Sequence, residues 1–289
     1  MAAPIPHTTL ASPPGQATPP GAWDCHIHIN DPAYPYVPGA SLTPPPALLS
    51  DYQRLQRALG LQHVVIVQPS SYGVDNTCTL DSTMAMAPHA RAIVCVSPDT
   101  PLDTLAAMHA KGARGVRLNF TRPPTTPLED IVPLAKKMAD LGWHLQVHGR
   151  IDQLLPLFPV FRLLPCPLVF DHLGRLPVAP PHPGFDEIKR LIDTGNTWIK
   201  LSCAYYTPPQ PARLPSRPAY PVASALMKAY LDLAPDRMVW GSNWPHPASS
   251  HGELALPDDA HLLDLLAAAC GNAHTYQQVL CDNPQRLYA

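Results

Sequence analysis

Eight short apolar runs alternate with segments of helical spacing, and this order is the strongest constraint on the fold. The runs occupy residues 22–29, 63–68, 92–97, 115–120, 144–148, 168–175 (including an exit loop), 197–202 and 237–243. The helical segments are 48–59, 79–86, 101–111, 128–141, 151–164, 185–194, 222–233, 261–270 and 275–280. Apolar runs joined by helices are typical of parallel sheets. We therefore predict a closed (β/α)8 barrel of the α/β class.

The length of the chain, 289 residues, suits one such barrel, which typically needs about 250 residues. Residues 1–21 are rich in Pro, Ala and Thr without periodicity, so we predict a proline-rich tail followed by a single domain over 22–289. The alternative is an open doubly wound sheet. No glycine-rich phosphate fingerprint follows the first apolar run, which counts against that alternative.

Composition narrows the class of partner. A net charge of −2 gives no reason to expect nucleic acid or an anionic membrane. No apolar run is long enough to cross a bilayer, and the first residues lack the pattern of a signal peptide. The seven cysteines show no paired motif, which favours free thiols and a cytoplasmic location. A small molecule is the expected partner.

Polar residues stand at the ends of several runs. His26 and His28 end the first, His148 the fifth, His172 lies in the sixth and Asn243 ends the eighth. The carboxyl ends of barrel strands meet on one face, so these side chains should converge. Imidazole nitrogens suit zinc or manganese, and a metal-bound water becomes a nucleophile near neutral pH. Alternatively, the histidines are ordinary polar or core residues.

Cations and hydroxyls accompany these histidines. Arg117 interrupts an apolar run, and a buried charge needs a partner. A bound anion is the natural candidate for Arg117 and the nearby Arg122, although a structural ion pair would also explain Arg117. Ser70 and Tyr72 lie in a loop after the second run, where helix capping is the competing interpretation.

The chain resembles the amidohydrolase superfamily, and within it the lactone hydrolases that act on 2-pyrone-4,6-dicarboxylate and 4-sulfomuconolactone. The stretches that carry the resemblance are residues 24–28, 65–70, 73–76, 114–120, 170–175, 238–247 and 283–288. They extend from about residue 21 to the end of the chain, and together they are specific to the group but not to one substrate.

The resemblance implies hydrolysis of a carboxylated or sulfonated lactone, such as an intermediate of aromatic catabolism. It implies one divalent metal, with zinc as first candidate, or none, because the pyrone dicarboxylate lactonases work without one. The implied metal ligands are His26, His28 and His148, and the implied catalytic residues are His172 and Asn243. The implied substrate-binding residues are Ser70, Tyr72, Arg117, Arg122, Arg175 and Tyr206.

Two positions depart from the family pattern. The family carries Asp where this chain has Asn243, and an amide cannot take a proton from water. We interpret Asn243 as an inactivating substitution, unless another base replaces the Asp. His148 stands where the pyrone lactonases have Tyr, which favours the metal-dependent relatives. A lactone isomerase, a decarboxylase and a non-catalytic lactone-binding protein are the alternatives to a hydrolase.

Overall fold

The structure, a computed structural model, describes residues 7, 12–121, 125–210 and 217–289. Within that part of the chain, eight parallel strands form one sheet in sequential order, β1 to β8. They are β1 Trp23–Ile27, β2 His63–Val67, β3 Ala90–Val94, β4 Ala113–Asn119, β5 His144–His148, β6 Leu168–Phe170, β7 Thr197–Leu201 and β8 Met238–Trp240. The predicted single-domain barrel is confirmed.

The barrel closes between β1 and the segment that follows β8. The backbone N–H of Asn243 donates to His26 O, and that of His28 donates to Trp244 O, both at 2.8 Å. Gly241 permits this close approach, since a Cβ there would lie 2.6 Å from Cβ of His26 and 2.7 Å from its backbone nitrogen. Because Gly241 has no side chain, the backbone of His26 can lie directly against the end of the eighth strand.

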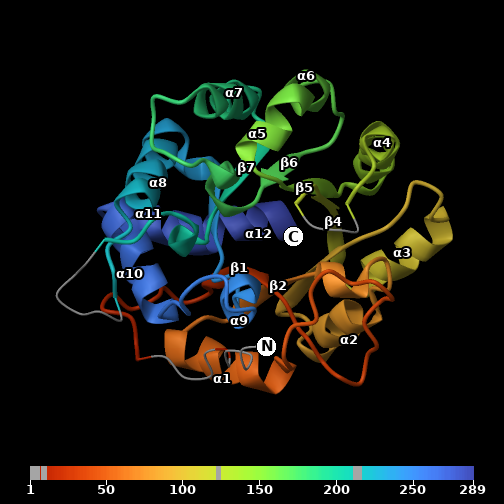
Figure 1. The fold of residues 1–289 in the computed structure, drawn as a ribbon, viewed down its shortest axis with the longest axis horizontal. Helices are drawn as coiled ribbons and strands as arrows, with labels where there is room; N and C mark the ends of the chain where they lie inside the picture. Colours follow the sequence, from red (N-terminus) through yellow and green to blue (C-terminus); the bar gives the residue numbers. More distant parts are fainter. Residues whose placement is uncertain (1–6, 8–11, 122–124, 211–216) are drawn as a thin grey trace.

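Helices surround the sheet (Figure 1). The longer ones are α1 Leu49–Leu59, α2 Thr77–Ala85, α3 Leu102–Ala110, α4 Ile131–Leu141, α7 Pro183–Ile192, α8 Pro221–Leu233 and α10 Asp259–Cys270. Gly60 and Gly142 follow α1 and α4 in the left-handed conformation, as helix-terminating glycines do. Over 151–164 we predict a helix interrupted by its prolines, and the structure has three short pieces there, α5 Ile151–Leu154, η3 Leu155–Leu157 and α6 Phe158–Phe161, because proline lacks the N–H that a continuous helix needs.

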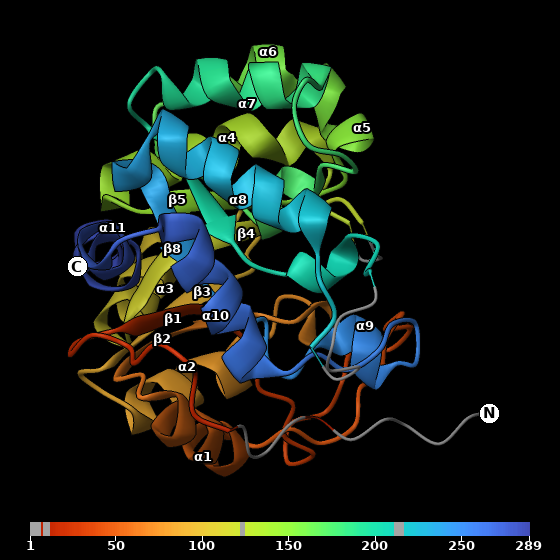
Figure 2. The same cartoon turned by 90° about the vertical axis from the view of Figure 1, so that its left-hand side faces the viewer.

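The two ends of the barrel are covered differently. In Figure 2, α9 (Pro247–Ser250) lies on the opposite side of the molecule from α11 (Ala273–Gln277) and the carboxyl terminus. The last helix, α12 (Asn283–Tyr288), covers the amino ends of the strands, where Tyr288 stacks on Trp23 and packs edge-on against His144. The carboxyl ends of the strands are thus the open end.

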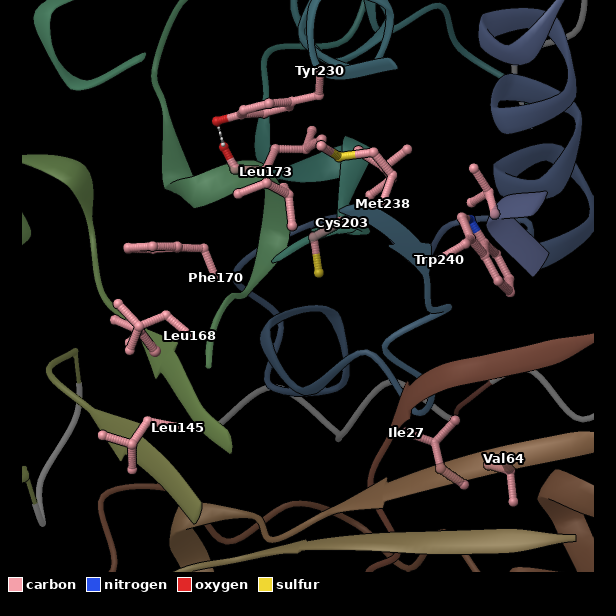
Figure 3. Packing of buried hydrophobic residues seen from close by; sticks show 14 of the residues in the cluster. Ile27, Val64, Leu145, Leu168, Phe170, Leu173, Cys203, Tyr230, Met238 and Trp240 are labelled. Atoms are coloured by element: carbon pink, nitrogen blue, oxygen red, sulfur yellow. Dashed lines mark hydrogen bonds between the residues drawn. The ribbon is translucent and has the colours of Figure 1, made fainter. Parts of the chain in front are cut away.

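Apolar side chains fill the space between the sheet and the helices, as Figure 3 shows around Phe170, Leu173 and Met238. In that layer the hydroxyl of Tyr230 on α8 donates to Leu173 O at 3.2 Å, which ties the helix to the exit of β6. A second apolar cluster fills the inside of the barrel. It contains Trp23, Cys25, Val65, Val67, Ile93, Val169, Trp198, Val239 and Tyr288.

Most strands are shorter than the apolar runs predict. The largest differences are at the carboxyl ends, where β1 stops at Ile27, β6 at Phe170 and β8 at Trp240, and β3 begins and ends earlier than 92–97. After β6, β7 and β8 the chain leaves the extended conformation through residues with positive φ. Among the described non-glycine residues these are His172, Leu173, Arg175, Cys203, Asn243 and His246. Such conformations are uncommon outside glycine and cluster at functional sites, which places the strained backbone at the open end.

Candidate active site

A bulge in β1 turns both of its histidines into the barrel. The register with β2 pairs Asp24 with Val64 and Ile27 with Ile66, so three steps along β1 match two along β2. Cys25 lies in the inner apolar cluster, yet His26 also faces inward, toward Asp171 after β6 and Lys200 on β7. His28, one residue past β1, contacts His26 and lines the cavity described below. The extra residue at the bulge allows this change in alternation, and bulges commonly re-aim side chains next to active sites.

The nitrogen atoms of His26 and His28 could hold a metal ion. Their Nε2 atoms lie 3.3 Å apart. Two imidazoles bound to one tetrahedral zinc at 2.0–2.1 Å would be separated by about 3.3 Å, so the pair fits. Nδ1 of His28 lies 2.8 Å from Val67 O, where it must carry the proton, which leaves Nε2 with its lone pair.

His148 lies near His172 and Asp171 as well as on the cavity that His28 lines. Its Nδ1 is 3.9 Å from Oδ2 of Asp171, and its ring lies 5.1 Å from that of His172. His26, Asp171 and His172 each offer a ligand atom, and these atoms all lie within 4.8 Å of one another. The structure therefore shows two overlapping candidate metal sites that share His26, and His148 borders the second.

Asp171 and Lys200 form a buried charge network below the histidines. Lys200 Nζ donates to Gln146 Oε1 at 2.6 Å and to Cys25 O at 2.8 Å, and it lies 3.8 Å from Asp171 Oδ1. Arg117 Nε and Gln146 Nε2 donate to the other carboxylate oxygen at 3.3 and 3.1 Å. Nδ1 of His26 is 3.3 Å from Oδ1, so the carboxylate also orients the first histidine.

Burial sets the protonation state of the histidines. It lowers the pKa of His26 to about 4, and it lowers the pKa values of His28, His148 and His172 well below the usual value. For Asp171 burial alone would raise the pKa, but its interactions with the His26 ring and the Lys200 ammonium hold it well below its usual range. Four neutral imidazoles thus surround a charged carboxylate, and each can accept a proton or bind a cation.

His172 presents one of these neutral nitrogens to the cavity. Its Nδ1 lies 2.9 Å from Ser202 Oγ, and that hydroxyl also reaches Lys200 O at 3.5 Å. If Ser202 donates its proton to the carbonyl, Nδ1 of His172 is the donor to Oγ and its Nε2 keeps the lone pair.

An open cavity of about 530 Å³ lies above these groups. Of the predicted site residues, those that line it are His28, Ser70, Arg117, His148, His172, Arg175, Tyr206 and Asn243. Arg117 uses Nε for Asp171, and its terminal nitrogens have no hydrogen-bond partner within the described ranges. The structural ion pair of Arg117 is thus present, and anion binding by its terminal nitrogens stays a prediction.

The remaining predicted substrate-binding residues are Tyr72 and Arg122. Tyr72 does not line the cavity, since it is buried with its hydroxyl bonded to the backbone of Asp31 at 3.0 Å, and we correct its role to a structural one. Arg122 lies outside the described residues. Arg175 sits over the ring of Tyr206, with Cζ 4.4 Å from the centroid, so these two define one wall together.

Four residues of the site were not predicted from the sequence to belong to it: Lys200, Asp171, Gln146 and Tyr205. Lys200 could have been found by the signal that singled out Arg117, a charge inside an apolar strand. Tyr205 had no such signal, and it contacts the site through Asn243, whose Nδ2 donates to the Tyr205 hydroxyl at 2.8 Å. Two more cavity residues, Asn30 and Ser71, were not singled out from the sequence.

The family model described as amidohydrolase matches residues 23–289. A 2-pyrone-4,6-dicarboxylate hydrolase of Comamonas testosteroni is 32% identical, covering 96% of this chain and 93% of its own. A 4-sulfomuconolactone hydrolase of Hydrogenophaga intermedia is also 32% identical, over 93% and 89%. A D-galactarolactone isomerase of Agrobacterium fabrum is 30% identical, over 95% and 93%.

Solved structures agree with the fold. A ligand-free structure from Agrobacterium tumefaciens superposes with a TM-score of 0.87 at 28% identity, covering 97% of this chain and 98% of the other. Within the described residues, no helix has the length and apolar character needed to span a membrane.

Proposed function

The chain belongs to the amidohydrolase family, and on this premise we propose that it is a lactonase that opens the ring of a small anionic lactone. The similar proteins named above act on lactones, two as hydrolases and one as an isomerase. The observation that carries the proposal is the meeting of Arg117, Arg175 and the neutral His172 at one cavity. Such a set binds an anion and accepts a proton beside it.

The two arginines bind the carboxylate or sulfonate of the lactone. Guanidinium groups match these planar anions with two parallel hydrogen bonds. Since Asp171 is already balanced by Arg117 and Lys200, the region keeps a net positive charge before substrate enters. The substrate anion then orients the ring carbonyl toward the histidines.

His172 transfers the proton from the nucleophile to the leaving oxygen. Its Nε2 accepts a proton as the nucleophile attacks the carbonyl, and returns it to the ring oxygen when the C–O bond breaks. The N–H groups of Arg117 that are not used by Asp171 stabilise negative charge that develops on the carbonyl oxygen. Asn243 cannot act as a base, but it can hold the attacking group by a hydrogen bond.

A divalent metal fits this site. His26 and His28 would hold it through Nε2, with His148 or the Asp171 and His172 pair nearby. When bound, the ion polarises the lactone carbonyl as a Lewis acid. Zinc is the first candidate, because its preferred nitrogen ligands match these side chains.

Asn243 favours a second candidate function, a lactone isomerase. In that reaction a hydroxyl of the substrate attacks the carbonyl in place of water, and His172 again moves the proton from nucleophile to leaving oxygen. An aspartate, which would activate water, is not needed. The isomerase and the hydrolase would use the same site residues, and they differ only in the role of Asn243.

A panel of carboxylated lactones, followed by mass spectrometry, tests both proposals. The panel contains 2-pyrone-4,6-dicarboxylate, 4-sulfomuconolactone and D-galactarolactone. A hydrolase adds the mass of one water, whereas an isomerase leaves the mass unchanged and shifts the retention time. Binding of a lactone without turnover, in protein loaded with zinc or freed of metal, would support the non-catalytic alternative and contradict both.

A further inference from the structure

We propose that Asp259, His246 and Tyr205 are positioning residues that fix which atom of Asn243 faces the cavity. None of the three lines the cavity, whereas Asn243 does. They therefore act through Asn243 and not by touching a ligand. They come from the segments after β7 and β8 and from the first turn of α10.

The four side chains form one continuous line of hydrogen bonds. Oδ1 of Asp259 lies 3.0 Å from His246 Nε2, and His246 Nδ1 lies 3.1 Å from the hydroxyl of Tyr205. That hydroxyl lies 2.8 Å from Nδ2 of Asn243, and it also accepts a hydrogen bond from the Cys203 thiol at 3.5 Å. All four side chains are at most 4% exposed, so water does not compete for these bonds.

The direction of each bond follows from counting protons. The carboxylate of Asp259 can only accept, so Nε2 of His246 carries the proton, and in that tautomer Nδ1 has the lone pair. Nδ1 must then receive the single proton of Tyr205. Burial raises the pKa of Tyr205 well above its usual value, so its hydroxyl keeps that proton.

The phenolic oxygen of Tyr205 uses its single proton in the bond to His246, so it can only accept the next bond. The atom of Asn243 that meets it must therefore be the NH₂ group and not the carbonyl oxygen. Oδ1 of Asn243 is turned the other way, and within the described ranges it has no hydrogen-bond partner. The cavity is thus offered a hydrogen-bond acceptor, which takes a hydroxyl or a water.

An aspartate at this position would not need such orientation, because its two oxygens are chemically the same. This difference provides the test. Removing the Tyr205 hydroxyl should lower the rate of lactone opening when residue 243 is Asn, and it should change that rate little when residue 243 is Asp. A purely structural role for Tyr205 would have the same effect in both backgrounds.

The first measurement is the rate of lactone opening by four proteins: wild type, Tyr205→Phe, Asn243→Asp and the double variant. It uses the lactone from the panel above that is turned over, so this arm rests on the proposed function. Tyr205→Phe should lower kcat on the order of tenfold in the Asn background, since a buried amide loses its acceptor. In the Asp background the change should be less than about twofold.

The second measurement needs no substrate. In protein labelled with ¹⁵N-asparagine, the side-chain amide of Asn243 is assigned by its loss in Asn243→Asp. Tyr205→Phe should speed hydrogen exchange of that amide roughly two- to tenfold, because its hydrogen bond is removed. Tyr276→Phe is the control, since Tyr276 is a buried tyrosine on α11 whose hydroxyl has no hydrogen-bond partner among the described residues.

The two arms separate failure of the inference from failure of the proposed function. If no lactone is turned over but the Asn243 amide responds only to Tyr205→Phe, the inference holds and the function is wrong. If the amide exchanges at the same rate in wild type and Tyr205→Phe, the inference is overturned. Equal losses of kcat in the Asn and Asp backgrounds would overturn it as well.

Discussion

The ammonium nitrogen of Lys200 lies 3.8 Å from Oδ1 of Asp171 inside the barrel, and neither side chain is exposed to solvent. Arg117 binds the other oxygen of the same carboxylate at 3.3 Å. One buried anion therefore faces two cations directly beneath the cavity. This excess of positive charge gives an anionic substrate a physical reason to bind there.

Lys200 should make folding stability depend on pH. Burial lowers its pKa from the ordinary 10.5 to about 8, although Asp171 partly opposes the change. Between these values the unfolded chain binds more protons than the folded protein, so the contribution of Lys200 to stability rises with pH, on the order of 3 kcal/mol in total. Urea unfolding of metal-free wild type and Lys200→Met from pH 7 to 10.5 measures it. A difference between the two proteins that stays constant over that range would contradict the prediction.

The protein should bind at most one divalent ion per chain at this site. Arg117 and Asn119 occupy the end of β4, where no carboxylate or lysine is available to bridge a second ion, and the Arg117 guanidinium repels one. Metal analysis after dialysis against zinc checks the stoichiometry. His28→Asn should weaken binding by more than about tenfold, whereas His274→Asn, on α11, should not. Two stoichiometric ions bound through these histidines would contradict this.

Asn243→Asp should raise the rate of lactone hydrolysis by about 10²- to 10⁴-fold with little change in affinity. Asn and Asp have nearly the same size, and only the carboxylate can take a proton from water. Initial rates at one saturating lactone concentration over a range of pH test this, and the gain should rise with pH as the new carboxyl ionises. Equal rates in both proteins would show that Asn243 belongs to a different mechanism, such as isomerisation.

Arg175→Met should weaken lactone binding roughly ten- to a hundredfold, the value of a charge-assisted pair of about 1.5–3 kcal/mol. Its guanidinium stacks on Tyr206 and not on a buried carboxylate, so the melting temperature should change little. Arg117→Met should affect both quantities, because it also removes a partner of buried Asp171. Titration calorimetry measures the lactone affinity and thermal melting measures the stability of each variant. Arg190→Met, at an exposed position on α7, is the control. Normal binding by Arg175→Met would remove it from the proposed site.

The residues that carry the site were largely predictable because barrel topology fixes where strand ends meet. His28, His148, His172 and Asn243 each follow or end an apolar run, and all four line the same cavity. Tyr72 was misplaced for a local reason. Its loop folds into a short 3-10 turn, and this turn directs the ring toward Asp31 and away from the cavity.

Sequence alone determined the barrel, since eight apolar runs separated by helices leave few other ways to bury them. It also determined that His26 and His28 share a face, because alternate residues of a strand do. Which face they share was decided by the bulge in β1, and a bulge depends on pairing with β2. In the same way, the Asp171 and Lys200 pair and the line from Asp259 to Asn243 join residues far apart in the chain. Their distances and proton positions exist only once the closed barrel has brought those strand ends together.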